Sequence, residues 1–118
     1  MPAPIVLVHT SNELLARSAA LLRAAGKEAI TFSSSLAAIS QIKAPGRLRV
    51  LATAVAYPAG QPHGVSLAQM ALHHHPSAAV IFIVRPELLE HVDFGQVLLW
   101  PVSAEQLCAA VLRVSSND

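Results

Sequence analysis

The sequence carries little charge, since Asp, Glu, Lys and Arg make up 13% of its 118 residues, about half the usual share. Hydrophobic residues make up 53%, and the formal net charge is +1. The basic residues are scattered apart from a loose group at Lys43, Arg47 and Arg49. The sequence lacks the basic stripe with interleaved aromatics that a nucleic-acid surface needs, so we expect no nucleic-acid binding. Two interpretations of the weakly charged surface stay open: a protein interface, or an ordinary alanine-rich surface.

Cysteine occurs once, as Cys108, so an internal disulfide is impossible. Apolar neighbours in a predicted helix favour a buried, inert thiol, and a reducing cytoplasmic compartment fits. The N-terminus lacks the basic and then apolar pattern of a secretory signal. No apolar run approaches the roughly 18 residues of a membrane span. We therefore expect one soluble cytoplasmic domain, residues 1–118, without membrane contact.

Short apolar runs alternate with helical patterns along the chain. The runs predict strands over residues 4–8, 28–32, 49–55, 79–84 and 96–100. A capping box of Thr10 and Glu13 predicts the start of the first helix and Gly26 its end. Further helices are predicted after Ser33 to Ser35 and over residues 65–75, with a stunted one over 85–91. A last helix over 103–114 is predicted to begin with a capping box of Ser103 and Gln106. This alternation predicts an α/β fold, a five-stranded parallel sheet of flavodoxin-like order 2-1-3-4-5 with helices on both faces.

Two classes of site are missing from the sequence. His9, Thr10, Ser11 and Asn12 follow the first strand, and they provide no glycine-rich loop for a dinucleotide. No nucleophile and base, and no pair of carboxylates, converge at any place that the predicted elements define. We therefore expect neither a cofactor nor enzymatic activity.

The element order, the element lengths and the corner at Trp100, Pro101 and Val102 together resemble the receiver (CheY-like) domain of bacterial two-component response regulators. The resemblance covers about residues 4–114. The third helix ending in HHHP before AVIFIV, and VLLWPVSAEQL after a shortened fourth helix, are similar to that family as well. The resemblance implies a cis peptide bond between Trp100 and Pro101 and a role in signal transduction.

The phosphorylation site of the family is not preserved. Receivers bind Mg²⁺ with acidic residues after the first strand, and an aspartate ending the third strand accepts the phosphoryl group, because both steps require carboxylates. Carried over by position, the acidic pair falls on His9 and Thr10, and the acceptor falls on Ala54, or on Ala56 if the loop insertion precedes Pro58. The hydroxyl that ends the fourth strand in the family falls on Val84. The lysine falls on Trp100, just before Pro101, and the aromatic residue of the fifth strand falls on Val97. We call these positions the vestigial site.

No shift of the alignment supplies an acceptor, because no Asp or Glu stands between Glu28 and Glu87. The sequence therefore predicts a degenerate pseudo-receiver that cannot undergo aspartyl phosphorylation. Trp100 is expected to fill the space that lysine and the phosphoryl group occupy in the family.

The histidines suggest metal binding only weakly. His73, His74 and His75 are consecutive, and consecutive helical residues do not share a face, so a solvated helix end is favoured over a metal site. His9 could pair with His63 to hold an anion or a metal, although a hydrogen bond to the backbone is the favoured role. Thr10 is explained as a helix N-cap.

Two departures from the family indicate where partners bind. The loop over residues 56–64 is about two residues longer than usual, and Tyr57 on it is either a plain surface residue or an element that closes over the pocket or contacts a partner. The fourth helix is about six residues short, which exposes the edge near Val97 and Leu99. In receivers the face made by the fourth helix, the fifth strand and the last helix forms the dimer and output surface. The shortened helix is therefore either a remodelled partner surface or a harmless deletion, and the resemblance implies a protein partner or a homodimer through this face. The alternative function is small-ligand sensing by the vestigial pocket near His9, Tyr57 and Trp100.

Overall fold

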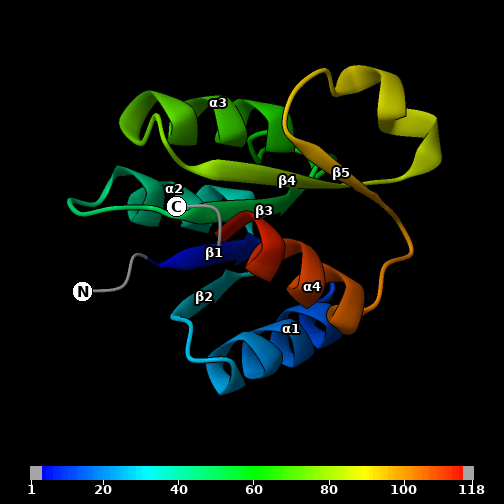
Figure 1. Cartoon of the computed structure of the whole chain (residues 1–118). Coiled ribbons are helices and arrows are strands. Elements are labelled where there is room, and N and C mark those ends of the chain that lie inside the picture. The colour runs from blue at the N-terminus through cyan, green and yellow to red at the C-terminus, as the bar shows by residue number, and fades with distance from the viewer. Residues whose placement is uncertain (1–3, 116–118) are drawn as a thin grey trace.

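The computed structural model describes residues 4–115, which form a five-stranded parallel sheet in the order β2-β1-β3-β4-β5 with helices on both faces (Figure 1). This arrangement confirms the predicted fold class and strand order. In chain order, the elements are β1 (Ile5–Val8), α1 (Asn12–Ala24), β2 (Ala29–Phe32), α2 (Ser35–Lys43), β3 (Val50–Ala54), α3 (Gly64–His74), β4 (Ala79–Val84), the 3-10 helix η1 (Pro86–His91), β5 (Gln96–Leu99) and α4 (Ala104–Ser115).

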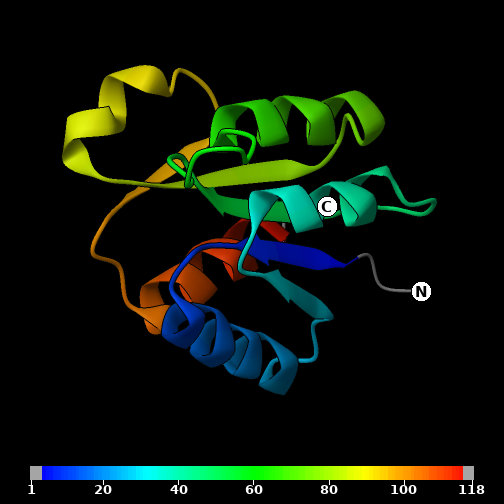
Figure 2. The same cartoon turned by 180° about the vertical axis from the view of Figure 1, so that it is seen from behind.

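The central strands are buried on both faces, which explains why they read as continuous apolar runs. Every residue of β1 and β3 is buried. Successive side chains of a strand point to opposite faces, so Ile5 and Leu7 pack with α1 and α4, whereas Val6 and Val8 pack with α2 and α3. Figures 1 and 2 show the two helix pairs on opposite sides of the sheet.

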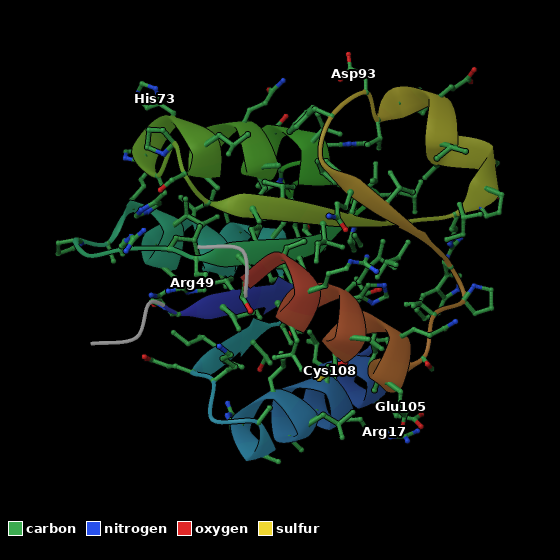
Figure 3. All side chains as sticks on the ribbon, in the orientation of Figure 1. Arg17, Arg49, His73, Asp93, Glu105 and Cys108 are labelled. Atoms are coloured by element: carbon green, nitrogen blue, oxygen red, sulfur yellow. The ribbon has the colours of Figure 1, made fainter. Side chains whose placement is uncertain are left out.

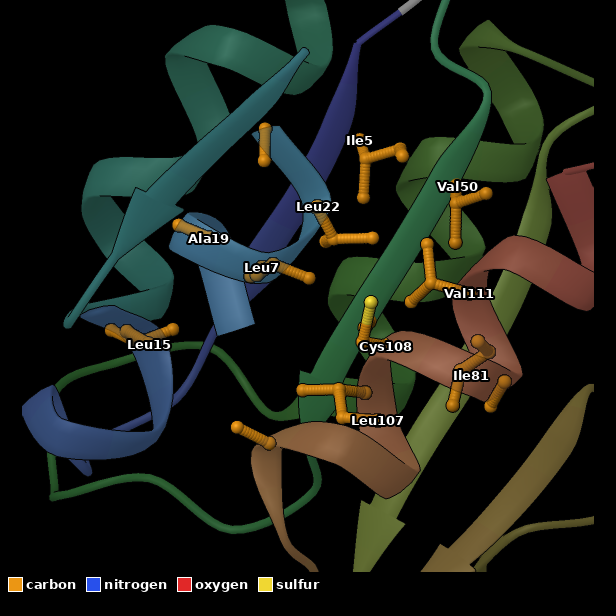
Figure 4. Packing of buried hydrophobic residues seen from close by; sticks show 14 of the residues in the cluster. Ile5, Leu7, Leu15, Ala19, Leu22, Val50, Ile81, Leu107, Cys108 and Val111 are labelled. Atoms are coloured by element: carbon orange, nitrogen blue, oxygen red, sulfur yellow. The ribbon is translucent and has the colours of Figure 1, made fainter. Parts of the chain in front are cut away.

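Cys108 belongs to the core between the sheet and the pair α1 and α4. Its side chain lies beside Leu107 and Val111 of α4 (Figure 4). Only 8% of the residue is exposed, and burial, with a smaller contribution from Glu105, raises the pKa of the thiol. These facts confirm the prediction of a buried thiol.

The start of α1 corrects the predicted capping box. Ser11 is the N-cap, because its Oγ accepts a hydrogen bond from the Leu14 N–H at 3.2 Å, whereas Thr10 is exposed and lies before the cap. The Nδ1 of His9 accepts from the Ser11 N–H at 2.9 Å, and this bond places Ser11 at the first turn. The predicted N-cap role of Thr10 is therefore wrong by one residue. Glu13 still lies in the first turn, where a negative charge is favourable.

The start of α4 follows the sequence pattern. The Ser103 N–H donates to Gln106 Oε1 at 2.9 Å, and the Gln106 N–H donates to Ser103 Oγ at 3.0 Å, which is a reciprocal capping box. An exposed ion pair of 3.1 Å between Arg17 and Glu105 joins α1 to α4 (Figure 3). Because both side chains are solvated, this pair contributes little stability.

The short fourth helix is a 3-10 helix with no buried residue. The predicted stunted helix over residues 85–91 is thus present, and β5, the last strand in the sheet order, forms a sheet edge. Within residues 4–115, no helix combines the length and the apolar character needed to cross a bilayer.

Candidate functional site

A pocket of about 400 Å³ opens at the carboxyl ends of the strands, and we call it the strand-end pocket. Its wall brings together the predicted residues His9, Thr10, Ala54, Tyr57 and Trp100. In an open α/β sheet, ligands bind at this edge, where loops leave the strands. The prediction that Trp100 fills the space at this edge is therefore only partly right: Trp100 forms one wall, and an open space remains.

The rings of His9 and Trp100 stack, with centroids 4.9 Å apart and planes inclined by 25°. The backbone N–H of Trp100 donates to the Val84 carbonyl at 2.8 Å, which fixes the backbone of Trp100 beside the end of β4. The peptide bond between Trp100 and Pro101 is cis, as expected. This stack joins residues that follow β1 and β5, two strands that are not neighbours in the sheet.

His9 is a neutral hydrogen-bonding residue in this environment. It is 7% exposed, and its Nδ1 accepts from the Ser11 N–H, which confirms the predicted hydrogen bond to the backbone. With Nδ1 as the acceptor, the ring proton is assigned to Nε2. Burial and, to a smaller extent, the charge of Arg85 lower the pKa of His9. The neutral ring therefore has one donor, the Nε2–H, at neutral pH.

Tyr57 folds back onto the strand ends. Its hydroxyl donates to the Val8 carbonyl at 2.9 Å and lies 2.7 Å from Thr53 Oγ1, which can donate to it. Val8 and Thr53 are paired across β1 and β3, so the tyrosine bridges the ends of these two strands. Burial raises the pKa of Tyr57 to about 12.

The rest of the loop after β3 is held as well. The Ser35 N–H donates to Gln61 Oε1 at 3.0 Å, and the Ser35 hydroxyl donates to the Pro62 carbonyl at 2.7 Å. Together with Tyr57, these bonds attach the loop to β1, β3 and the first turn of α2. The loop is thus held in place, and its residues Ala56, Tyr57 and Pro58 form part of the pocket wall.

Ala54 and the start of α3 are in close backbone contact. Ala54 is 8% exposed, and the Gly64 N–H donates to the Val55 carbonyl at 2.8 Å. A Cβ added at Gly64 would collide with the Ala54 carbonyl oxygen. Only glycine allows this approach, so the residue marks where α3 packs on the end of β3.

The lining residues do not fit a magnesium ion. Mg²⁺ requires hard oxygen ligands, usually including carboxylates, and none of the residues lining the pocket is acidic. Among residues 4–115, no three His, Cys, Asp or Glu side chains gather as a metal site. His9, Thr10 and Ala54, which line the pocket, provide no carboxylate.

Arg85 is a residue of the pocket wall that the sequence analysis did not predict. It follows β4 directly, its side chain is exposed, and it lines the pocket. Its charge is close enough to His9 to lower the pKa of that imidazole. Its place immediately after an apolar strand was the available signal, because the carboxyl end of every strand meets this edge.

Several other predicted residues lie outside the pocket wall. Val84 is fully buried in the core between the sheet and the pair α2 and α3. His63 is exposed, precedes α3 and makes no side-chain capping bond. It does not line the pocket with His9, so the less favoured alternative, a pair of His9 and His63, is not formed at the pocket wall.

The three consecutive histidines separate into different roles. His73 and His74 are exposed, and His73 points away from the molecule (Figure 3). His75 is bound on both ring nitrogens: Nδ1 accepts from the Leu48 N–H at 3.3 Å, and Nε2 lies 2.8 Å from the Ile42 carbonyl, to which it donates in this tautomer. His75 thereby joins the end of α3 to the end of α2.

Apolar side chains are exposed on the part of the sheet that the short helix leaves open. Leu89 of η1 is 43% exposed, and Val97 and Leu99 of β5 are 37% and 51% exposed. We call these three residues the β5 face. A sheet edge also presents unpaired backbone groups, so the β5 face combines apolar area with free hydrogen-bonding positions.

No protein-family model and no curated protein sequence matches the chain. Solved structures of receivers are similar to it throughout. A response regulator receiver protein from Sinorhizobium medicae is 23% identical, with a TM-score of 0.81, and the alignment covers 98% of this chain and 95% of that one. The chemotaxis response regulator CheY4 of Vibrio cholerae is 19% identical, with a TM-score of 0.78 and coverage of 97% and 99%.

A structure described as an adenylate cyclase from Rhodopirellula baltica is similar too, at 19% identity and a TM-score of 0.79, with coverage of 98% of this chain and 89% of that one. At these identities the likeness shows the fold, which is that of CheY-like receiver domains.

Proposed function

We propose that this chain is a pseudo-receiver that takes part in signal transduction through protein contact, without aspartyl phosphorylation and without catalysis. The observation that carries the proposal is the absence of any acidic residue from the lining of the strand-end pocket, in a fold whose phosphorylated members react there. The scattered charges and the single cysteine support a cytoplasmic domain that binds protein and not nucleic acid.

The replacement residues oppose phosphoryl transfer chemically. Ala54 has no nucleophile, and His9 is held neutral against Trp100. Arg85 carries a positive charge at the same wall, which disfavours a second cation such as Mg²⁺. A phosphorylation step would therefore lack both its acceptor and its metal.

Incubation with acetyl phosphate and Mg²⁺ tests this part of the proposal. We expect the intact mass to stay unchanged, whereas a receiver with its aspartate, treated in parallel, should gain a phosphoryl group. A mass increase of one phosphoryl group that hydroxylamine removes would identify an acyl phosphate and refute the proposal.

We propose the β5 face as the contact surface, for a homodimer or for another protein. The exposed Leu89, Val97 and Leu99 support this assignment, since apolar residues on an edge strand are a liability unless a partner covers them. A stable interface would bury at least about 1,000 Å² in total.

Sedimentation of two matched variants tests the homodimer. Leu99 and Leu36 are exposed to 51% and 57%, but Leu36 lies on α2, away from β5. We expect Leu99→Asp to weaken self-association and Leu36→Asp to leave it unchanged. Equal effects of the two variants, or a wild-type protein that stays monomeric at high concentration, would refute the homodimer.

The second candidate function is small-ligand sensing by the strand-end pocket. Its volume of about 400 Å³ lies within the usual range of ligand sites. Polar groups of His9 and Arg85 meet apolar walls there, which is the composition of a site that binds and orients a small molecule.

A further inference from the structure

We infer that the strand-end pocket binds a small organic anion with a flat apolar body, of which an aromatic carboxylate is the simplest example. The inference rests on the ligand-sensing function proposed above and gives it a ligand class. It does not depend on the β5 face, so the two can fail separately.

The charge of the pocket has one sign. Arg85 lines it, and no acidic side chain does. Among the described residues, Arg85 has no carboxylate partner. An unpaired guanidinium at a pocket wall favours an anion, and its planar fork suits a carboxylate in particular.

Two further features of the pocket wall favour an anion. The Nε2–H of His9 makes no hydrogen bond within the described residues, although the residue is buried at the pocket wall. Thr10 and Ser11, which also line the pocket, lead into the 13-residue helix α1. Its N-terminal end carries a partial positive charge, which adds to that of Arg85.

The remaining walls are apolar and aromatic. Ile83, Leu88 and Val55 line the pocket together with the rings of Tyr57 and Trp100. Aromatic rings prefer to pack against flat partners in stacked or edge-to-face geometry. An inorganic anion would leave these walls uncovered, so the pocket selects an anion that carries a ring or a comparable apolar body.

Trp100 provides the measurement, because it is the only tryptophan of the chain and lies in the pocket wall. Its fluorescence is titrated with benzoate at pH 7, with neutral benzamide of the same shape, and with inorganic phosphate. We expect saturable binding of benzoate with a Kd on the order of 0.1 to 1 mM, as for a ligand of this size with one charge pair. Benzamide and phosphate should each bind at least about tenfold more weakly, because each lacks one of the two recognised features.

Arg85→Gln and the control Arg47→Gln remove the same charge at two exposed positions, of which only the first lines the pocket. We expect Arg85→Gln to weaken benzoate binding about tenfold or more and Arg47→Gln to leave it unchanged. Equal binding of benzoate and benzamide, equal binding of benzoate and phosphate, no saturable binding of benzoate, or equal effects of the two substitutions would each overturn the inference. A failure here leaves the acetyl phosphate and sedimentation results intact.

Discussion

Tyr57 offers a sharp test of the strand-end architecture, because it is the only tyrosine of the chain. Its absorbance near 295 nm on ionisation therefore reports one residue. The structure places its hydroxyl between the Val8 carbonyl and Thr53 Oγ1, and burial raises its pKa to about 12. An exposed tyrosine would titrate near 10. We expect the titration of the folded protein to lie well above that of the urea-unfolded chain.

The raised pKa of Tyr57 also predicts how stability depends on pH. The unfolded chain loses the phenolic proton near pH 10, whereas the folded protein keeps it until about pH 12. Between these values the folded state binds more protons, so the free energy of unfolding falls as pH rises. Two pKa units correspond to about 2 to 3 kcal/mol, which is present below pH 10 and lost by about pH 12.

Tyr57→Phe separates this effect from the other groups that titrate at high pH. The variant loses the hydrogen bond to Val8, which should lower the free energy of unfolding by about 1 kcal/mol at neutral pH. Urea denaturation of both proteins between pH 8 and pH 12 gives the difference, in which lysine and cysteine contributions cancel. The reasoning is refuted if Tyr57 titrates near pH 10 while circular dichroism shows that the protein is still folded. It is also refuted if the wild type and Tyr57→Phe lose stability in parallel as pH rises.

Three further expectations concern single residues of the site and its support. Because the pKa of His9 is lowered in the folded protein, the unfolded chain binds a proton at a higher pH than the folded protein does, and the free energy of unfolding should fall as pH drops below about 6.5. His9→Asn keeps an acceptor for the Ser11 N–H and should reduce this fall, measured by urea denaturation at several pH values. His75→Ala leaves two backbone groups unbonded and should lower the free energy of unfolding by about 1 to 3 kcal/mol, whereas His73→Ala, an exposed control, should change it little. Gly64→Ala adds a Cβ that collides with the backbone at Ala54. It should lower the free energy of unfolding by about 1 to 3 kcal/mol and the melting temperature with it; an unchanged melting temperature would refute the close packing of α3 on β3.

Much of the fold could be predicted because its signals are local and repeated. The run AVIFIV matches β4 residue for residue, and the predicted edges of the other strands differ from the observed ones by at most one residue at each end. Apolar runs of this length occur where both faces of a parallel strand are covered. The capping box of Ser103 and Gln106 was equally local and is present.

The parts that could not be predicted depend on contacts between distant segments. Thr10 and Ser11 both suit an N-cap, and the side chain of His9, by bonding the Ser11 N–H, decides between them. The direction of Tyr57 depends on Val8, 49 residues away. The open volume of the pocket depends on where the ring of Trp100 comes to rest against His9, which side-chain size alone does not reveal.

The stack of His9 on Trp100 has a thermodynamic consequence for the two proposed functions. Trp100 forms one wall of the pocket and directly follows Leu99 of the β5 face, so this residue borders both surfaces. Any ligand that favours one position of this ring changes the affinity of a partner that favours another position. Linkage then requires the partner to change the affinity for the ligand by the same factor. The fold-change that the partner causes in the Kd of the ligand should therefore equal the fold-change that the ligand causes in the Kd of the partner.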